Sequence, residues 1–202
     1  MNHLLGNNNI FIRFISLYAL GLILFFMSWT IAYYFLPEGL LRNIGQLGRL
    51  AGDTAASSLH REFIQILLLN MLGFTFILGS NFILRVKNIS FGYLVPLAWM
   101  IMYAVTLGTN SFSIPMEATM APSLDVFGRS GLYEMMAAVL FAVATNTISF
   151  NKSETFFTPS KKVPRAERSM KKEQWIAMSV ALLILAAAAF REAYMIMEQA
   201  LL

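Results

Sequence analysis

The first candidates for chemistry in this chain are ionisable residues that lie inside otherwise apolar stretches. Glu134 lies in one stretch, and Arg191 and Glu192 are neighbours in another. An ionisable side chain within a membrane is costly and is a functional candidate by default. If both stretches cross a membrane as helices, Glu134 and Arg191 lie within ~10 Å of the same outer interface, at a rise of ~1.5 Å per residue. The sequence therefore predicts an ion pair between Glu134 and Arg191, with Glu192 as the competing partner.

Two alternatives to a purely structural ion pair stay open at this point. The charged residues could form a site that handles an ion or a peptide, or their charged ends could reach the interface without any partner. The neutral polar residues Gln65, Asn70 and Asn146 also lie within apolar stretches. Such amides usually bond to a neighbouring helix, and we expect that role for them rather than a place in a transport path.

Five long apolar stretches position these residues. They cover about residues 10–36, 63–86, 89–108, 131–150 and 175–197. Each is long enough to cross the hydrocarbon core of a bilayer as a helix, which takes ~20 residues. They are continuously apolar and do not alternate, which favours helices over a membrane β-barrel. The sequence predicts an all-α fold, with residues 1–202 forming one integral membrane domain of five transmembrane helices.

Two of the connections carry patterns of their own. The first connection, about 37–62, places Leu40, Ile44 and Leu47 on one helical face. This pattern predicts an amphipathic helix at the membrane surface, or alternatively a helical extension that packs on the bundle. The third connection, about 109–130, has few charges and contains prolines. It predicts a loop that dips back into the outer surface of the protein.

Basic residues gather in the fourth connection and predict the orientation in the membrane. Because this side should be cytoplasmic, five spans place the N-terminus in the cytoplasm and the C-terminus outside, in a multi-pass plasma-membrane protein. The connection is expected to be flexible. It would attract anionic lipid headgroups or recognise a cytoplasmic partner. The cluster consists of Lys152, Lys161, Lys162, Arg165, Arg168, Lys171 and Lys172.

Composition narrows the function further. The chain is 57% apolar and 13% charged, and it has no cysteine. Disulfides, thiolate catalysis and cysteine-ligated metals are therefore excluded. The sequence has no phosphate-binding glycine loop, metalloprotease motif or hydrolase motif. We therefore expect no enzyme activity and no cofactor, and we interpret the net charge of +4 as a topology signal, with no nucleic-acid partner.

Four short features follow one another along most of the chain. Phe63–Asn70 opens the second stretch, and Gly92 follows a tight turn. Gly131–Glu134 opens the fourth stretch, and Ala189–Tyr194 closes the fifth with a Glu-Ala pair. In order and spacing these features resemble the stage II sporulation protein M family, a broad group of bacterial and archaeal integral membrane proteins.

The resemblance implies a non-enzymatic subunit or scaffold of a larger membrane complex. Some relatives anchor cell-wall enzymes, and others accompany ATP-binding cassette proteins in the export of, or immunity to, circular bacteriocins. Membrane lipids and other complex proteins, such as a separate ATPase or a cell-wall enzyme, are the expected partners, and a homo-oligomer is compatible with the sequence. The alternative is a small stand-alone transporter or channel. Twin carboxylates on a water-accessible path would favour it, and only Glu134 and Glu192 are available for that role.

Overall fold

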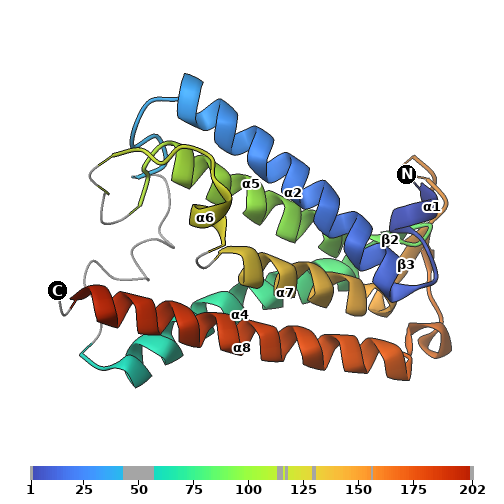
Figure 1. The fold of residues 1–202 in the computed structure, drawn as a ribbon. Helices are drawn as coiled ribbons and strands as arrows, with labels where there is room; N and C mark the ends of the chain where they lie inside the picture. Colours follow the sequence, from blue (N-terminus) through green and yellow to red (C-terminus); the bar gives the residue numbers. More distant parts are fainter. Residues whose placement is uncertain are drawn as a thin grey trace.

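Long helices form a bundle in this protein (Figure 1). The computed structural model describes residues 2–42, 57–112, 116, 118–128, 131–155 and 157–200. The bundle helices are α2 (Ile10–Phe35), α4 (Leu59–Ile83), α5 (Leu94–Gly108), α7 (Gly131–Ala144) and α8 (Lys172–Ala200). Short helical elements join them: α1 (Asn2–Leu5), α6 (Leu124–Phe127) and the 3₁₀ turns η1 (Phe91–Tyr93), η2 (Asn146–Ile148) and η3 (Arg165–Arg168).

Four of the described helical segments are long and apolar enough to cross a membrane. They are Ile10–Phe35, Leu59–Ile83, Phe91–Gly108 and Lys172–Glu198. This finding indicates a membrane protein. The large apolar side chains exposed along α2, such as Phe11 and Ile23, then face lipid rather than water.

The fourth predicted span is shorter than expected. We expected residues 131–150, but α7 ends at Ala144 and is about 21 Å long at ~1.5 Å per residue. It ends there because neighbouring side chains bind the carbonyl groups that its last turn leaves free. Asn81 Nδ2 donates to the Ala142 carbonyl at 3.1 Å, and Gln174 Nε2 donates to the Ala144 carbonyl at 2.9 Å.

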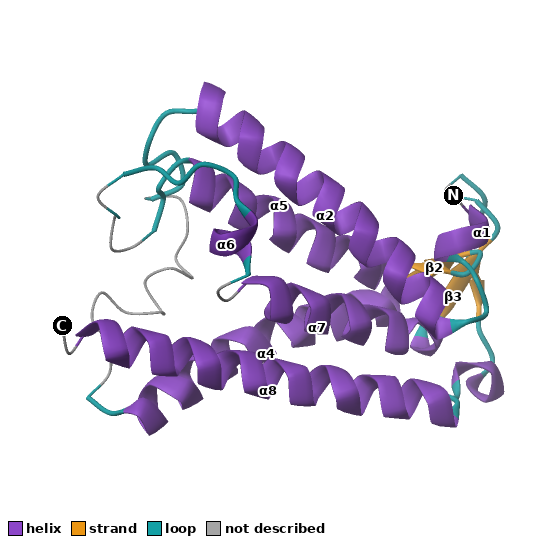
Figure 2. Cartoon of the chain, viewed as in Figure 1, coloured by secondary structure: helices purple, strands orange, loops and turns teal. Residues whose placement is uncertain are grey.

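A small sheet corrects the all-α prediction (Figure 2). Its strand order is β2-β1-β3-β4, with β1 parallel to β3 and the other pairs antiparallel. Residues 84–86, expected at the end of the second span, form a strand because the chain turns back through Lys87, which has a φ of 53°. The strands are β1 (Leu84–Val86), β2 (Ile89–Ser90), β3 (Asn151–Ser153) and β4 (Lys161–Lys162).

Described residues of the third connection pack against α2. The indole Nε1 of Trp29 donates to the Met120 carbonyl at 2.9 Å. The ring of Phe127, in α6, lies 4.6 Å from the ring of Phe25 near the middle of α2. By contrast, the surface helix expected within 37–62 falls mainly on residues 43–56, which lie outside the described residues.

The central helix of the bundle is α7, which packs along α8 and also contacts α2 and α4. Alanines line its contacts, and Ala138 and Ala142 are fully buried, as are Ala181 and Ala189 on α8. Small side chains let helix backbones approach closely in membranes. The sheet and α1 lie at one end of the bundle and the last turns of α8 at the other (Figure 1), so α7 connects two separate polar regions.

Candidate functional site

The first polar region is a pair of carboxyl groups between α7 and α8. Glu134, in the first turn of α7, and Glu192, on α8, hydrogen-bond to each other through their side chains. Asn70 of α4 donates from Nδ2 to Glu134 Oε1 at 2.8 Å. A carboxylate only accepts hydrogen bonds, so two carboxyl groups can share one only when one of them carries a proton. Three helices therefore meet at a site that can hold a single proton between two carboxylates.

The predicted ion pair between Glu134 and Arg191 is not formed among the described residues, and this part of the prediction was wrong. The Arg191 side chain is exposed and donates to the Gly128 carbonyl at 3.0 Å. Its guanidinium carbon lies 5.3 Å from the centre of the Tyr133 ring. The reason is helical phase: adjacent residues project ~100° apart around a helix. Glu192 faces α7, so the Arg191 side chain points away from α7 itself. It reaches Gly128, which lies before the start of α7.

A third carboxylate lies near this pair. Glu62, in the first turn of α4, is buried, and its negative charge acts on Glu192. The rings of Phe63 and Phe190, which lie 5.9 Å apart, pack α4 against α8 at the same level. Within the described residues, no group of three acidic or histidine side chains is arranged to hold a metal ion.

The second polar region lies at the other end of α7, and its central residue, Asn81, was missed by the sequence interpretation. Asn81 is fully buried. Its Nδ2 donates to the Ala142 carbonyl and to Thr145 Oγ1, the latter at 2.7 Å, and its Oδ1 accepts from the Ser90 hydroxyl. The Ser149 hydroxyl donates to the Asn81 carbonyl at 2.7 Å. One asparagine thus joins α4, α7 and the hairpin of β1 and β2.

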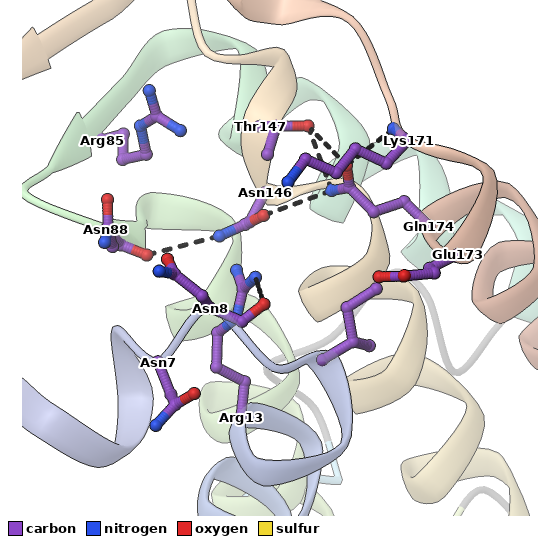
Figure 3. A pocket seen from close by; sticks show the side chains of 11 residues that line it. Asn7, Asn8, Arg13, Arg85, Asn88, Asn146, Thr147, Lys171, Glu173 and Gln174 are labelled. Carbon is purple, nitrogen blue, oxygen red and sulfur yellow. Dashed lines mark hydrogen bonds between the residues drawn. The ribbon is translucent and has the colours of Figure 1, made fainter.

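Asn146 lies just beyond the end of α7 and not within a span as expected. It is buried in η2, and its Nδ2 donates to the Asn88 carbonyl at 3.3 Å. Gln174, in the first turn of α8, is also buried. Its Nε2 donates to Thr147 Oγ1 at 3.0 Å, and its Oε1 accepts from the Lys171 backbone amide at 3.0 Å. These residues line a small cavity at this end of the bundle (Figure 3).

The predicted basic connection is built into a folded structure. Lys152 lies on β3, Lys161 and Lys162 on β4, Arg165 and Arg168 on η3, and Lys171 and Lys172 at the start of α8. We expected a flexible loop, but backbone pairing fixes it.

The pairing between strands also aligns charges across the sheet. Arg85 pairs with Lys152, and Lys152 pairs with Lys161, so three cations stand side by side on one face. Burial lowers the pKa of Arg85, the carboxylate of Glu167 opposes this effect, and the charge of Arg13 adds to it. Like charges placed opposite each other destabilise a sheet. Nearby anions would therefore stabilise this arrangement.

The helices and these two polar regions define a helical membrane protein. Comparisons of the chain with protein-family models, curated proteins and solved structures found no match.

Proposed function

We propose that this chain is a non-enzymatic integral membrane subunit that works in a complex with another protein, as the resemblance to the stage II sporulation protein M family implies. The observation that carries the proposal is an exposed aromatic residue in the fourth connection. Phe157 is 99% exposed between β3 and β4, close to the exposed lysines of β4. Aromatic residues are enriched in the buried centre of protein interfaces.

The turn that carries Phe157 is held by several hydrogen bonds. The Ser153 hydroxyl lies 2.7 Å from Thr158 Oγ1, and the Thr155 amide donates to the same oxygen at 3.0 Å. The Phe157 amide donates to Thr155 Oγ1 at 3.3 Å. Because these bonds hold the backbone of the turn, only the Phe157 side chain would need to be ordered when a partner covers it. The geometry therefore favours a preformed docking point.

The basic residues of this connection support a cytoplasmic docking point under the positive-inside rule. The N-terminus is then cytoplasmic and the C-terminus external, with α7 as a short fifth crossing. Of the partners that the resemblance implies, a separate ATPase fits this side of the membrane. A cell-wall enzyme would instead bind the opposite end of the bundle.

Purification in mild detergent with quantitative mass spectrometry tests the proposal. Phe157→Ala should weaken binding of the partner about thirtyfold, the effect of losing one interface hot spot of about 2 kcal/mol, and should lower the recovery of the partner accordingly. Leu124→Ala is the matched control, because Leu124 is 75% exposed and lies in α6 of the third connection, away from the sheet. Equal recovery with wild type and Phe157→Ala would contradict this docking point.

A stand-alone transporter is the second candidate, and the carboxyl pair is the observation that favours it. Glu134 and Glu192 share a hydrogen bond between helices, as a proton-coupled carrier would require. Purified protein in liposomes distinguishes the two functions. The transporter predicts solute flux by the chain alone. Glu134→Gln should abolish this flux and Arg191→Gln should retain it, and that result would overturn the subunit proposal.

A further inference from the structure

A polar cavity lies where α2, the hairpin of β1 and β2, η2 and the start of α8 meet (Figure 3). It encloses about 120 Å³, enough for several waters, which occupy ~30 Å³ each in the liquid, or for one tetrahedral oxyanion. Its lining contains three cations, Arg13, Arg85 and Lys171, and a single carboxylate, Glu173. Because Lys171 and Glu173 are both exposed, water screens their opposite charges, and the two arginines dominate the interior.

Arg13 is the central observation. Its side chain is only 7% exposed and points from α2 toward Asn146 (Figure 3). Its NH2 group makes a long hydrogen bond of 3.4 Å to the Asn8 carbonyl, whereas its buried Nε has no hydrogen-bond partner. Among the described residues no carboxylate forms an ion pair with it. A buried guanidinium without an anion is costly, so the site lacks a negative charge.

Arg85, on β1, is a second cation at the cavity whose buried Nε has no hydrogen-bond partner. The residue is half-buried, and the carboxylate of Glu167 offsets part of its charge. Its positive charge and that of Arg13 are close enough to oppose each other. An anion placed between two such cations would relieve their repulsion and use donors that are otherwise unpaired.

The backbone adds to the positive field. The cavity lies at the N-terminal ends of α2, which has 26 residues, and α8, which has 29 residues. The N-terminus of a helix carries the positive end of its dipole and favours bound anions. Asn88 and Asn146 supply neutral amide groups on the cavity wall. Fixed guanidinium groups, helix ends and amides together match a phosphate group better than a carboxylate, because phosphate offers more acceptor oxygens.

We propose that this cavity binds a phosphate group, carried either by a lipid headgroup or by free inorganic phosphate. A lipid source fits the position, because α2 enters its apolar span at Ile10, directly beside the cavity. The phosphate would contact Arg13 and Arg85, with Lys171 at the exposed rim.

Calorimetric titration of the purified, delipidated protein in mild detergent tests the proposal in two arms. One arm adds inorganic phosphate, and the other adds a soluble short-chain phosphatidic acid, both at constant ionic strength set with chloride. Binding in the first arm identifies free phosphate as sufficient, and binding in the second arm alone identifies the lipid as the source. No binding in either arm overturns the proposal.

Matched variants separate a built site from general charge attraction. Arg13→Gln and Lys162→Gln each remove one positive charge, but Lys162 lies on β4 outside the cavity lining. Arg13→Gln should weaken binding about tenfold, the effect of losing charge-assisted hydrogen bonds, and Lys162→Gln less than about twofold, as for an exposed charge. If Arg13→Gln does not fold, Arg85→Gln should show the same loss. Equal effects at the cavity and at Lys162 would overturn the proposal.

Discussion

Replacing Glu134 by alanine should destabilise the folded protein, because it removes both hydrogen bonds that this carboxyl group makes. Asn70 Nδ2 is 2.8 Å from Glu134 Oε1, and the second bond joins Glu134 to Glu192. Hydrogen bonds between membrane helices contribute about 0.6–1.7 kcal/mol each. Losing two of them predicts a fall of about 1–3 kcal/mol in the free energy of unfolding.

Glu134→Gln should be much milder. The glutamine amide keeps an oxygen that accepts from Asn70 and gains an NH₂ group that donates to the Glu192 carboxylate. The volume is also almost unchanged. We therefore expect a change of about 1 kcal/mol or less in the free energy of unfolding. Both variants remove the charge, so the difference between their effects measures the hydrogen bonds together with the packing of the side chain.

Equilibrium unfolding of the purified protein in detergent mixtures measures these values, and double-mutant cycles assign the partner. Glu134→Ala and Glu192→Ala should be non-additive by about 0.5–3 kcal/mol, as for residues in contact. Glu134→Ala and Arg191→Ala should add within about 0.5 kcal/mol. The reverse outcome, with coupling to Arg191 and none to Glu192, would refute the assignment of the carboxyl pair.

Three further predictions follow from the fold. A cysteine at Ser160 should be protected from a membrane-impermeant thiol reagent in intact cells, and one at Ser123 should react; the opposite labelling would reverse the proposed orientation. Asn81→Leu should lower the free energy of unfolding by about 1–3 kcal/mol, because it leaves buried groups unpaired; denaturant titration would show no loss if the network were unimportant. Gly108→Ala should reduce thermal stability, since an added Cβ would lie 2.9 Å from the Trp29 carbonyl oxygen, and an unchanged melting temperature would contradict this close contact.

Composition was sufficient to predict the long helices, because a continuous apolar run leaves the backbone few alternatives in a membrane. The predicted span 10–36 corresponds to α2 at Ile10–Phe35, and 175–197 lies within α8. The end of α7 could not be predicted in this way. The apolar run continues past Ala144 to Phe150, and the helix stops because Asn81 and Gln174 bind its last carbonyl groups.

The sheet was missed because its strands are two or three residues long, too short to show alternation. The carboxyl pair, in contrast, had a signal in the sequence. Ala181, Leu185, Ala189 and Ala193 are buried on α8, and their spacing of four residues marks one helical face. Glu192 borders this face and Arg191 does not. The choice of Arg191 as the partner rested on opposite charge and shared depth, and it did not use the position of this face.

The placement of α7 bears on which of the two functions is better supported. Its start is held by the Glu134 hydrogen bonds and by the Tyr18 hydroxyl, which donates to the Leu132 carbonyl at 3.1 Å. Its end is held by Asn81 of α4 and Gln174 of α8. Alternating access requires one part of a bundle to rock against another, and any division that separates α7 from α2, α4 or α8 would break one of these hydrogen bonds. The carboxyl pair therefore fits a joint within a rigid subunit better than a moving proton carrier, and stabilisation without flux is the outcome that this geometry favours.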